Sequence, residues 1–375
     1  MMAPHAGLER RVIAALEASP PRIPVVLGGC GSGRTTALHA LVDHIGRTEC
    51  QYIDVERAAS TPERFFQSLT ASSPFPRAIA GDAPKSAREA FDHTLSYFAR
   101  ARAADGPATF LLDEVLELRT FESFPGLRHI LRELLQSLAE SGNRFVLTSR
   151  YVARAHRLLR DGAARFEVIH LPALSSSEVA AMLPPMGDAS AEDRDFLGRT
   201  IQALSDGRAS YVRAISEAAG GSNGRPGDPI SALTALLTSD GALATWCGYR
   251  YELRLHRARG YGALKAILEI LAEEEPLTLT EIAQRLHRTP GSTKDYLSWL
   301  EDVDLVIARQ KRYSFSDPLL RLWVRLHCRP VPPSVDEVAR EVQGYALARL
   351  PQTEPSMAMA GASTERKGWG IIEID

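Results

Sequence analysis

Four glycines fall within residues 28–33, between an apolar segment and a segment with helical spacing. Ile23–Leu27 before them is apolar enough for a buried strand, and Thr35–Ile45 after them places leucine and valine on one helix face. Ordering so many glycines costs conformational entropy, which favours a turn that wraps closely around a ligand. The spacing from Gly28 to Thr35 is typical of a loop whose backbone N–H groups surround phosphate at a helix N-terminus. The alternative is a glycine-rich turn without a ligand.

The residues of this loop form the predicted nucleotide site. The loop N–H groups and the positive end of the next helix favour phosphate, and the Thr35 hydroxyl is placed to bind Mg²⁺. Arg34 stands where such loops have lysine, so a planar, bidentate guanidinium replaces a compact ammonium near the reacting phosphates. Of the 44 basic residues 39 are arginine, so Arg34 follows a general preference of this chain. The residues predicted to contact ATP are Gly28, Gly29, Cys30, Gly31, Ser32, Gly33, Arg34, Thr35, Thr36 and Thr148.

A second apolar strand, Thr109–Leu112, is followed by two adjacent carboxylates. The carboxyl ends of parallel strands meet at the same edge of a sheet, so we expect Asp113 and Glu114 beside the glycine loop. Asp113 is predicted to bind Mg²⁺, and Glu114 to polarise the attacking water as a general base. A strand that ends in Asp-Glu is common. The assignment is strengthened because this strand follows both the glycine loop and another strand-like segment at 51–55.

A third apolar strand, Arg144–Thr148, leads into Ser149 and Arg150. Its polar end is expected beside the glycine loop for the same reason. Thr148 or Ser149 is predicted to contact the attacking water, and Arg150 to reach the γ-phosphate and respond to its loss. The alternative is that Arg150 is a solvated residue at the start of the next helix.

The chain shows alternating strand and helix signals first, then helix signals alone, and then a different mixture of helices and short strands. Further strand-like segments at 51–55 and 166–171 complete a set of five, which predicts a parallel sheet flanked by helices. Helix signals follow, and then the order helix, turn, helix and hairpin, which is typical of a winged helix-turn-helix. The predicted divisions are a phosphate-loop domain at 1–174, a helical domain at 175–253, a winged helix-turn-helix at 254–329, a helical extension at 330–350 and a flexible tail at 351–375.

The winged helix-turn-helix is a candidate for binding double-stranded DNA. Residues 254–329 carry 13 lysine and arginine residues against 10 aspartate and glutamate residues, a mild positive balance. The alternative is a unit that packs on the sheet domain or between copies of the chain. The candidate DNA contacts are Arg288, Thr293 and Lys294 in the predicted recognition helix and Arg309, Lys311 and Arg312 in the predicted wing.

Together, the glycine loop, the Asp113-Glu114 strand end and the Leu147–Arg150 strand end resemble the P-loop ATPases of the STAND class, within the AAA+-like group. The resemblance is greatest to archaeal-type ATPases with a C-terminal winged helix, and it covers residues 8–327. It implies an ATP-binding, Mg²⁺-dependent ATPase in which Glu114, Arg34 and Arg150 act in hydrolysis. Such ATPases carry a Gly-x-Pro motif in the helical domain, which Gly207-Arg208-Ala209 matches without the proline.

The net charge, the cysteine spacing and the apolar runs of the chain limit where the protein is expected to be located and what it is expected to bind. The formal net charge is −2, so no overall charge attracts the chain to nucleic acid or membranes. The four cysteines form no Cys-x-x-Cys pair, and no apolar window reaches the about 18 residues of a membrane span. We expect a cytoplasmic protein with reduced thiols and no membrane segment. Homo-oligomers, and a protein partner for the apolar end of the tail at 368–375, stay open.

Three functions fit these motifs. The first is an ATP-driven switch, in which hydrolysis changes the angle between the sheet and helical domains and the winged helix transmits the change. The second is a DNA-binding regulator or scaffold that holds nucleotide with little hydrolysis, which Arg34 and the missing proline at Ala209 favour. The third is a remodelling protein that forms oligomers with ATP. The first two differ chiefly in how well Arg34 supports hydrolysis.

Overall fold

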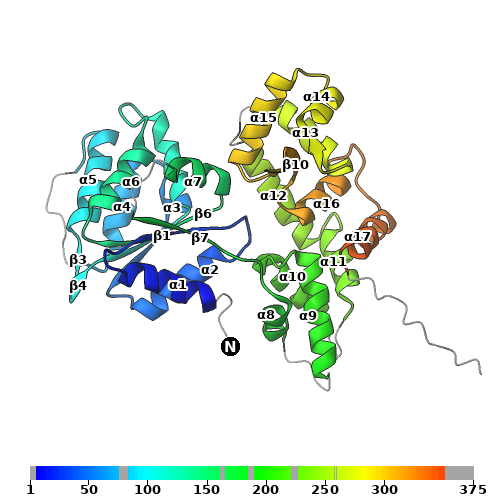
Figure 1. Ribbon diagram of the computed structural model, residues 1–375, viewed down its shortest axis with the longest axis horizontal. Helices are drawn as coiled ribbons and strands as arrows, with labels where there is room; N and C mark the ends of the chain where they lie inside the picture. Colours follow the sequence, from blue (N-terminus) through cyan, green and yellow to red (C-terminus); the bar gives the residue numbers. More distant parts are fainter. Residues whose placement is uncertain are drawn as a thin grey trace, which may run out of the picture.

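The computed structural model has two lobes side by side (Figure 1). A sheet with helices α1–α7 forms one lobe, and helices α8–α17 with a small sheet form the other. Within the described ranges, no helix combines the length and hydropathy of a membrane span. The described residues are 6–75, 83–160, 165–184, 190–220, 227–256, 258 and 260–350.

All five strands of the large sheet are parallel, in the order β2-β5-β6-β1-β7. Strand β1 lies between β6 and β7, with Val25 paired to Leu147 on one side and Val168 on the other, and its apolar residues are buried. This order sets the ends of β5 and β6 next to the loop that follows β1, and it confirms the predicted five-stranded parallel sheet. The strands are β1 (Ile23–Leu27), β2 (Cys50–Asp54), β5 (Thr109–Asp113), β6 (Arg144–Ser149) and β7 (Phe166–His170).

Helices cover both faces of this sheet (Figure 1). Apolar residues of α1 and α2 form one core cluster, and the larger core lies on the opposite face under α4, α5 and α6. The N-terminal helix α1 and the short hairpin β3–β4 were not expected from the sequence. The elements are α1 (Ala6–Glu17), α2 (Arg34–Ile45), α3 (Val55–Ala58), α4 (Pro62–Ala71), α5 (Ala87–Arg100), β3 (Arg102–Ala103), β4 (Gly106–Pro107), the 3₁₀ helix η1 (Val115–Ser123), α6 (Ile130–Glu140) and α7 (Val152–Leu159).

A helical domain follows the last strand of the large sheet. It begins with a capping box in which Ser175 and Glu178 satisfy each other's backbone N–H groups. Its last helix, α12, leads toward the winged helix-turn-helix and contacts α16 there. The helices are α8 (Ser176–Met182), α9 (Ala191–Ser205), α10 (Ala209–Ala219), α11 (Pro229–Leu237) and α12 (Ala242–His256).

The C-terminal unit has the predicted helix-turn-helix and hairpin. Its second helix, α14, is capped by Thr278, which forms a capping box with Glu281. The hairpin turn consists of only Gln310 and Lys311, both with positive φ, which is typical of a tight two-residue turn. The elements are α13 (Tyr261–Glu273), β8 (Leu277–Thr278), α14 (Leu279–Arg285), α15 (Pro290–Asp302), β9 (Val306–Arg309), β10 (Arg312–Phe315), α16 (Pro318–His327) and α17 (Val335–Arg349).

Candidate functional site

A cavity of about 370 Å³ lies where the glycine loop meets the ends of β5 and β6 and the helical domain. It gathers most of the predicted site residues and adds residues of the helical domain, of which the sequence analysis had named only Ala209. From the sheet lobe it is lined by Cys30, Gly31, Ser32, Gly33, Arg34, Thr35, Thr36, Asp54, Glu56, Asp113, Glu114 and Arg150. From the helical domain it is lined by Met182, Ala209, Ser210, Arg213 and Arg250.

The glycine loop adopts a backbone that requires glycine at two positions. Gly31 and Gly33 have φ values of 79° and 101°, in the left-handed region that side chains disfavour. A methyl group added at Gly31 would also overlap the hydroxyl oxygen of Ser210 on α10. The loop runs directly into α2, whose first-turn N–H groups have no partner within the helix. This is the geometry expected of a phosphate-binding loop.

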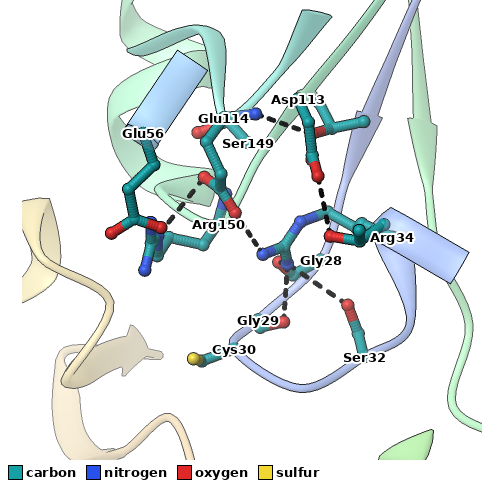
Figure 2. Close-up of polar contacts among 12 residues, drawn as sticks. Gly28, Gly29, Cys30, Ser32, Arg34, Glu56, Asp113, Glu114, Ser149 and Arg150 are labelled. Atoms are coloured by element: carbon teal, nitrogen blue, oxygen red, sulfur yellow. Dashed lines mark hydrogen bonds and ion pairs between the residues drawn. The ribbon is translucent and has the colours of Figure 1, made fainter. Parts of the chain in front are cut away.

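Arg34 turns its guanidinium back onto the loop (Figure 2). Its Nη1 donates to the Gly28 carbonyl, to the Gly29 carbonyl at 2.6 Å and to Ser32 Oγ at 3.2 Å. Its Nη2 pairs with Glu114 Oε1 at 2.5 Å, and the residue is only 7% exposed. A lysine ammonium lacks this planar fork. The arginine therefore ties the loop to the end of β5 by contacts that a lysine cannot all make.

Thr35 and Asp113 offer the oxygen ligands that Mg²⁺ prefers. Thr35 Oγ1 donates to Asp113 Oδ2 at 2.7 Å, and the Tyr52 hydroxyl donates to the same oxygen at 3.1 Å. A hydroxyl at the start of the helix and a carboxylate at the end of a neighbouring strand are the usual protein ligands of a Mg²⁺ ion completed by phosphate and water. The donor set therefore fits a Mg²⁺ ion that arrives with a nucleotide.

Glu114 lies between two arginines (Figure 2). Its Oε1 pairs with Arg34, and its Oε2 accepts from the Arg150 backbone N–H at 3.0 Å and lies 3.3 Å from Arg150 Nε. Burial opposes ionisation, but the charges of Arg34 and Arg150 hold the pKa of Glu114 below its ordinary value. Glu114 is therefore ionised with both oxygens engaged, and it becomes free to accept a proton from water only when these guanidinium contacts loosen.

Arg150 is a buried residue of the site, so the alternative of a solvated arginine is wrong. It is 7% exposed and lines the cavity. Its guanidinium contacts the carboxylates of Glu56, Glu114 and Glu117. The Tyr151 hydroxyl donates to Glu117 at 2.6 Å, which anchors this carboxylate. Arg150 is therefore held at the cavity by an acidic cluster.

The end of β6 lies beside the glycine loop, as expected, and the Gly28 N–H donates to the Ser149 carbonyl, but the Thr148 and Ser149 side chains do not line the cavity. Both are fully buried and neither lines the cavity, so the prediction that they contact nucleotide or attacking water is corrected. The Thr148 hydroxyl donates to Asp113 Oδ1 at 2.5 Å and accepts from the Glu114 N–H at 3.0 Å. Ser149 Oγ accepts from the Tyr151 N–H. Thr148 therefore positions the two adjacent carboxylates through its hydroxyl.

The helical domain contacts the loop through the Gly207-Arg208-Ala209 segment. Arg208 Nη1 donates to the Cys30 carbonyl at 3.0 Å, and the Ser210 N–H donates to the Gly31 carbonyl at 3.0 Å. Gly207 has a φ of 63°, and a side chain there would collide with the backbone of residue 174. The start of α10 is therefore hydrogen-bonded to the tip of the glycine loop although the motif lacks its proline.

A second arginine reaches the loop from α12. The Arg250 guanidinium lies 3.4 Å from the centroid of the Trp246 ring, and its buried Nη1 has no hydrogen-bond acceptor within the part of the chain that the structure describes. The same Nη1 would lie 3.1 Å from a methyl group at Gly31. Residues 246, 250 and 254 lie four apart and share one helix face. That spacing is the sequence signal that marks this face, but nothing in it tells which part of the chain the face contacts.

The winged helix-turn-helix also reaches the loop, through Asp304. Its carbonyl accepts from Arg254 Nη1 at 2.8 Å, while its buried Oδ2 has no hydrogen-bond partner among the described residues. This oxygen would lie 3.4 Å from a methyl group at Gly29. Burial raises the pKa of Asp304, against the opposing charges of Arg254, Arg208 and Arg34. An acidic residue of the C-terminal unit therefore lies against the phosphate-binding loop.

Five of the six candidate DNA contacts are exposed, namely Arg288, Lys294, Arg309, Lys311 and Arg312. Arg312 donates to the Pro276 carbonyl at 3.0 Å, so it is partly engaged within the domain. Thr293 is 0% exposed, and its hydroxyl donates to the Thr289 carbonyl. The prediction that Thr293 contacts DNA is corrected, because it lies on the inner face of α15.

Comparisons with known proteins agree with this architecture. Residues 263–307 match the family model described as winged helix-turn-helix DNA-binding. No curated protein matches the chain in sequence. Among solved structures, a Walker-type ATPase of Pyrococcus abyssi has a TM-score of 0.64 and 18% identity, over 86% of this chain and 96% of that chain.

Two other solved structures superpose less well. Cdc6p from Pyrobaculum aerophilum has a TM-score of 0.41 and 13% identity, over 93% of this chain and 96% of that chain. The Orc1 protein of Aeropyrum pernix, solved in complex with DNA, has a TM-score of 0.42 and 17% identity, over 93% of this chain and 95% of that chain. Superposition at this level supports no inference about the present chain.

The fold is that of a Walker-type P-loop ATPase followed by a helical region and a C-terminal winged helix-turn-helix. The predicted fold class is thus confirmed, and so is the resemblance to archaeal-type ATPases with a winged helix at the level of fold.

Proposed function

We propose that the protein is an ATP-binding, Mg²⁺-dependent ATPase that works as a nucleotide-driven switch with the winged helix-turn-helix as its output domain. The observation that carries the proposal is the contact of all three parts with one loop. The sheet supplies Asp113 and Glu114 beside it, the helical domain binds its Cys30 and Gly31 carbonyls, and Asp304 of the C-terminal unit lies against it. A movement of this loop would therefore alter its contacts with all three domains.

Each group of the site has a role in this proposal. Thr35 and Asp113 would hold Mg²⁺, which neutralises charge that develops on the phosphates. Glu114 polarises the attacking water once Arg34 and Arg150 turn from it to phosphate oxygens. The described arrangement is then the resting state, in which the two guanidinium groups are bound to Glu114 instead of phosphate. A nucleotide titration with and without Mg²⁺ tests the first step, and no binding in either case would overturn the proposal.

The second candidate function is a DNA-binding regulator or scaffold that holds nucleotide with little hydrolysis. The contacts of Arg34 favour it, because a guanidinium that binds two loop carbonyls and Glu114 keeps the base occupied. Calorimetric binding of ATP without phosphate release, also in the presence of DNA, would support this function over the switch.

The DNA-binding role is tested by charge reversal of Arg309, Lys311 and Arg312 to glutamate. We expect weaker binding to double-stranded DNA, and a slope of log affinity against log salt that is shallower by about 2 to 3, since each phosphate contact contributes roughly 0.9. Arg312 is expected to contribute least because it is partly engaged with Pro276. Fluorescence anisotropy at several salt concentrations measures both.

The matched control for this experiment reverses Arg10, Arg11 and Arg47, which are exposed on the sheet lobe. It changes the net charge equally and should leave the salt slope within experimental error of the unmodified protein. Equal losses in both triple variants would show a non-specific charge effect, and an unchanged affinity in the wing variant would assign the winged helix to packing.

The switch is tested at Asp304. Asp304→Asn removes a negative charge beside the loop but keeps a side chain that tolerates its φ of 55°. We expect nucleotide to bind about tenfold more tightly, because like charges at close range cost one or more kcal/mol. Asp302→Asn is the control, since Asp302 is in the same turn but pairs with Arg157. Equal affinities for the Asp304 variant and the unmodified protein in calorimetry would contradict coupling through this contact.

The finer assignments follow from the sequence resemblance. We place the protein in the STAND class of the AAA+-like group and in the cytoplasm, with homo-oligomers formed with ATP as a further proposal. The tail, where a docking peptide for a protein partner was predicted, lies outside the described residues.

A further inference from the structure

We propose that the sheet lobe carries a contact surface for the phosphates of double-stranded DNA, beside the second helix of the helix-turn-helix. This surface, the arginine groove, is defined by Arg128, Arg132, Arg154 and Arg157, which line one cavity. The inference rests on the proposed DNA-binding role of the winged helix-turn-helix. It does not depend on the nucleotide site, because none of the four arginines lines the cavity there.

The arginine groove lies between the two lobes. Helices α6 and α7 of the sheet lobe and Asp302, the last residue of α15, line a cavity of about 390 Å³. Figure 1 shows α7 and α15 facing each other across the lobes, and the two helices are in contact. Helix α15 is the second helix of the helix-turn-helix, which lies in the major groove in domains of this kind. A duplex bound by the winged unit is therefore brought next to this cavity.

The arginines reach the cavity from two neighbouring helices. Arg154 and Arg157 are three residues apart on α7 and share one face of that helix. Arg132 lies in the first turn of α6, and Arg128 lies in the turn directly before it. Arg128, Arg132 and Arg157 are exposed, and Arg154 is half-buried. The guanidinium groups are therefore accessible to the phosphates, which are the outermost groups of a duplex.

Three of these guanidinium groups have no partner in the part of the chain that the structure describes. The side chains of Arg128, Arg132 and Arg154 form no ion pair or hydrogen bond with any described residue, while Arg157 pairs with Asp302. The cavity wall holds two carboxylates against the four arginines. Planar guanidinium groups bind phosphate oxygens through pairs of N–H groups. The charge and the unused donors of the groove therefore match a strand of phosphates.

The arginine groove also reduces repulsion at the end of α15. This helix ends in Glu301 and Asp302, whose negative charges repel the phosphates of a duplex. Arg157 of the sheet lobe pairs with Asp302. The winged unit itself has only a mild positive balance, with 13 basic against 10 acidic residues at 254–329. The sheet lobe therefore adds positive charge for phosphate binding where the winged unit is acidic.

The residue type determines what this contact contributes to recognition. Contacts between arginine and phosphate fix the position of a protein on a duplex but carry no sequence information. The arginine groove is therefore a positioning surface, and any reading of bases belongs to α15. Because Arg157 pairs with Asp302 across the lobes, DNA in the groove would contact the sheet lobe and the winged unit together. DNA binding is thereby linked to the relative position of the two lobes.

The test combines Arg128→Gln, Arg132→Gln and Arg154→Gln in the full chain and measures the fluorescence anisotropy of a labelled duplex at several salt concentrations. We expect binding to be weaker by about tenfold or more, and the slope of log affinity against log salt to be shallower by about 2 to 3, since each phosphate contact contributes roughly 0.9. The midpoint of thermal unfolding should stay unchanged, because these side chains have no ion pair with any described residue.

The matched control combines Arg10→Gln, Arg11→Gln and Arg47→Gln, which are exposed on the sheet lobe outside the groove. It should keep the affinity and the salt slope of the unmodified protein. Equal losses in the groove variant and this control would overturn the proposal, because the loss would then follow net charge alone.

The outcomes separate this inference from the proposed function. Unchanged affinity and slope in the groove variant, with weaker binding in the wing variant, would overturn the arginine groove and leave the DNA-binding output domain intact. The reverse pattern would support the groove and overturn the role of the wing. If the unmodified protein binds no duplex, both DNA contacts are wrong, while the nucleotide titration still decides on the ATPase.

A second measurement locates the duplex directly. His129 lines the same cavity, so His129→p-benzoylphenylalanine should cross-link to duplex DNA on irradiation. The control is His44→p-benzoylphenylalanine, at an exposed position of α2 on the opposite face of the sheet, which should give only background cross-linking. Equal cross-linking from both positions, or cross-linking of His129→p-benzoylphenylalanine to single-stranded RNA but not to the duplex, would overturn the assignment.

Discussion

Replacing Glu114 with glutamine should lower the single-turnover rate of ATP hydrolysis by about 10² to 10⁴, the contribution of a general base. Glu114 is the carboxylate at the end of β5 that lines the cavity next to the proposed Mg²⁺ ligands Thr35 and Asp113. Glutamine keeps the shape and can still accept from the Arg150 N–H, but it cannot take a proton from water. ATP binding should stay within about threefold, because removing a general base changes the transition state more than the bound state.

The control for this variant is Glu56→Gln. Glu56 lines the same cavity and pairs with Arg150, but it belongs to α3 and not to the end of β5. Its loss should change the rate by less than about fivefold, since an ion pair to a group that keeps other carboxylate partners is worth little. Equal rates for the unmodified protein, Glu114→Gln and Arg34→Ala would overturn the assigned site. Measurement of released phosphate with enzyme in excess over ATP provides the rates.

Arg34→Ala should weaken ATP binding by about a hundredfold or more, since a charge-assisted hydrogen bond contributes roughly 1.5 to 3 kcal/mol and at least two are lost. The variant also removes the donor to the Gly28 and Gly29 carbonyls and one partner of buried Glu114. Its free energy of unfolding should fall by about 3 kcal/mol, because removing one member of a buried ion pair leaves the charge of the other buried without that partner. Calorimetry measures the affinity, and denaturant unfolding the stability.

Arg34→Lys separates the two functional hypotheses. Lysine keeps the positive charge for phosphate but cannot bind two carbonyls and Glu114 at once. ATP affinity should stay within about fivefold of the unmodified protein, because the single charge near phosphate is retained. If the switch hypothesis holds and the arginine restrains Glu114, single-turnover hydrolysis should increase severalfold. An unchanged or lower rate would show that the guanidinium does not restrain the base.

These results would bear on how the resting state is maintained. In the described arrangement, Arg34 and Arg150 neutralise Glu114, and the loop itself is bound by Arg208 and approached by Asp304. Phosphate competes for the same cations, so nucleotide would release Glu114 and repel Asp304 together. Activation of hydrolysis and movement of the winged helix-turn-helix would then have one cause.

The sequence by itself determined the catalytic framework of the sheet lobe. Glycine at 31 and 33, apolar runs before Gly28 and Asp113, and helical spacing after Thr35 are local signals, and each corresponds to a local backbone requirement. Their common location followed from the rule that parallel strands present their carboxyl ends at one edge. For these reasons the loop and Asp113-Glu114 were predicted together.

Side-chain direction at Thr148, Thr293 and Arg150 was decided by tertiary structure alone. Periodicity places a residue on a strand or helix, but packing against the neighbouring element determines whether that face is buried. Thr148 faces β5 and Thr293 faces the inside of the winged unit, so neither is free for a ligand. Arg150 is buried because three carboxylates converge on it, one from α3 and two from the segment that directly follows β5.

The contacts of Arg208, Arg250 and Asp304 with the glycine loop were also decided only by the tertiary structure. These residues lie roughly 180 to 275 positions after the loop in the chain, and no local pattern records which surface a helix or turn will meet. Their approach depends on the docking of the second lobe, which the sum of many apolar and polar contacts fixes. The sequence specified where phosphate binds, while the fold decided which distant charges surround it.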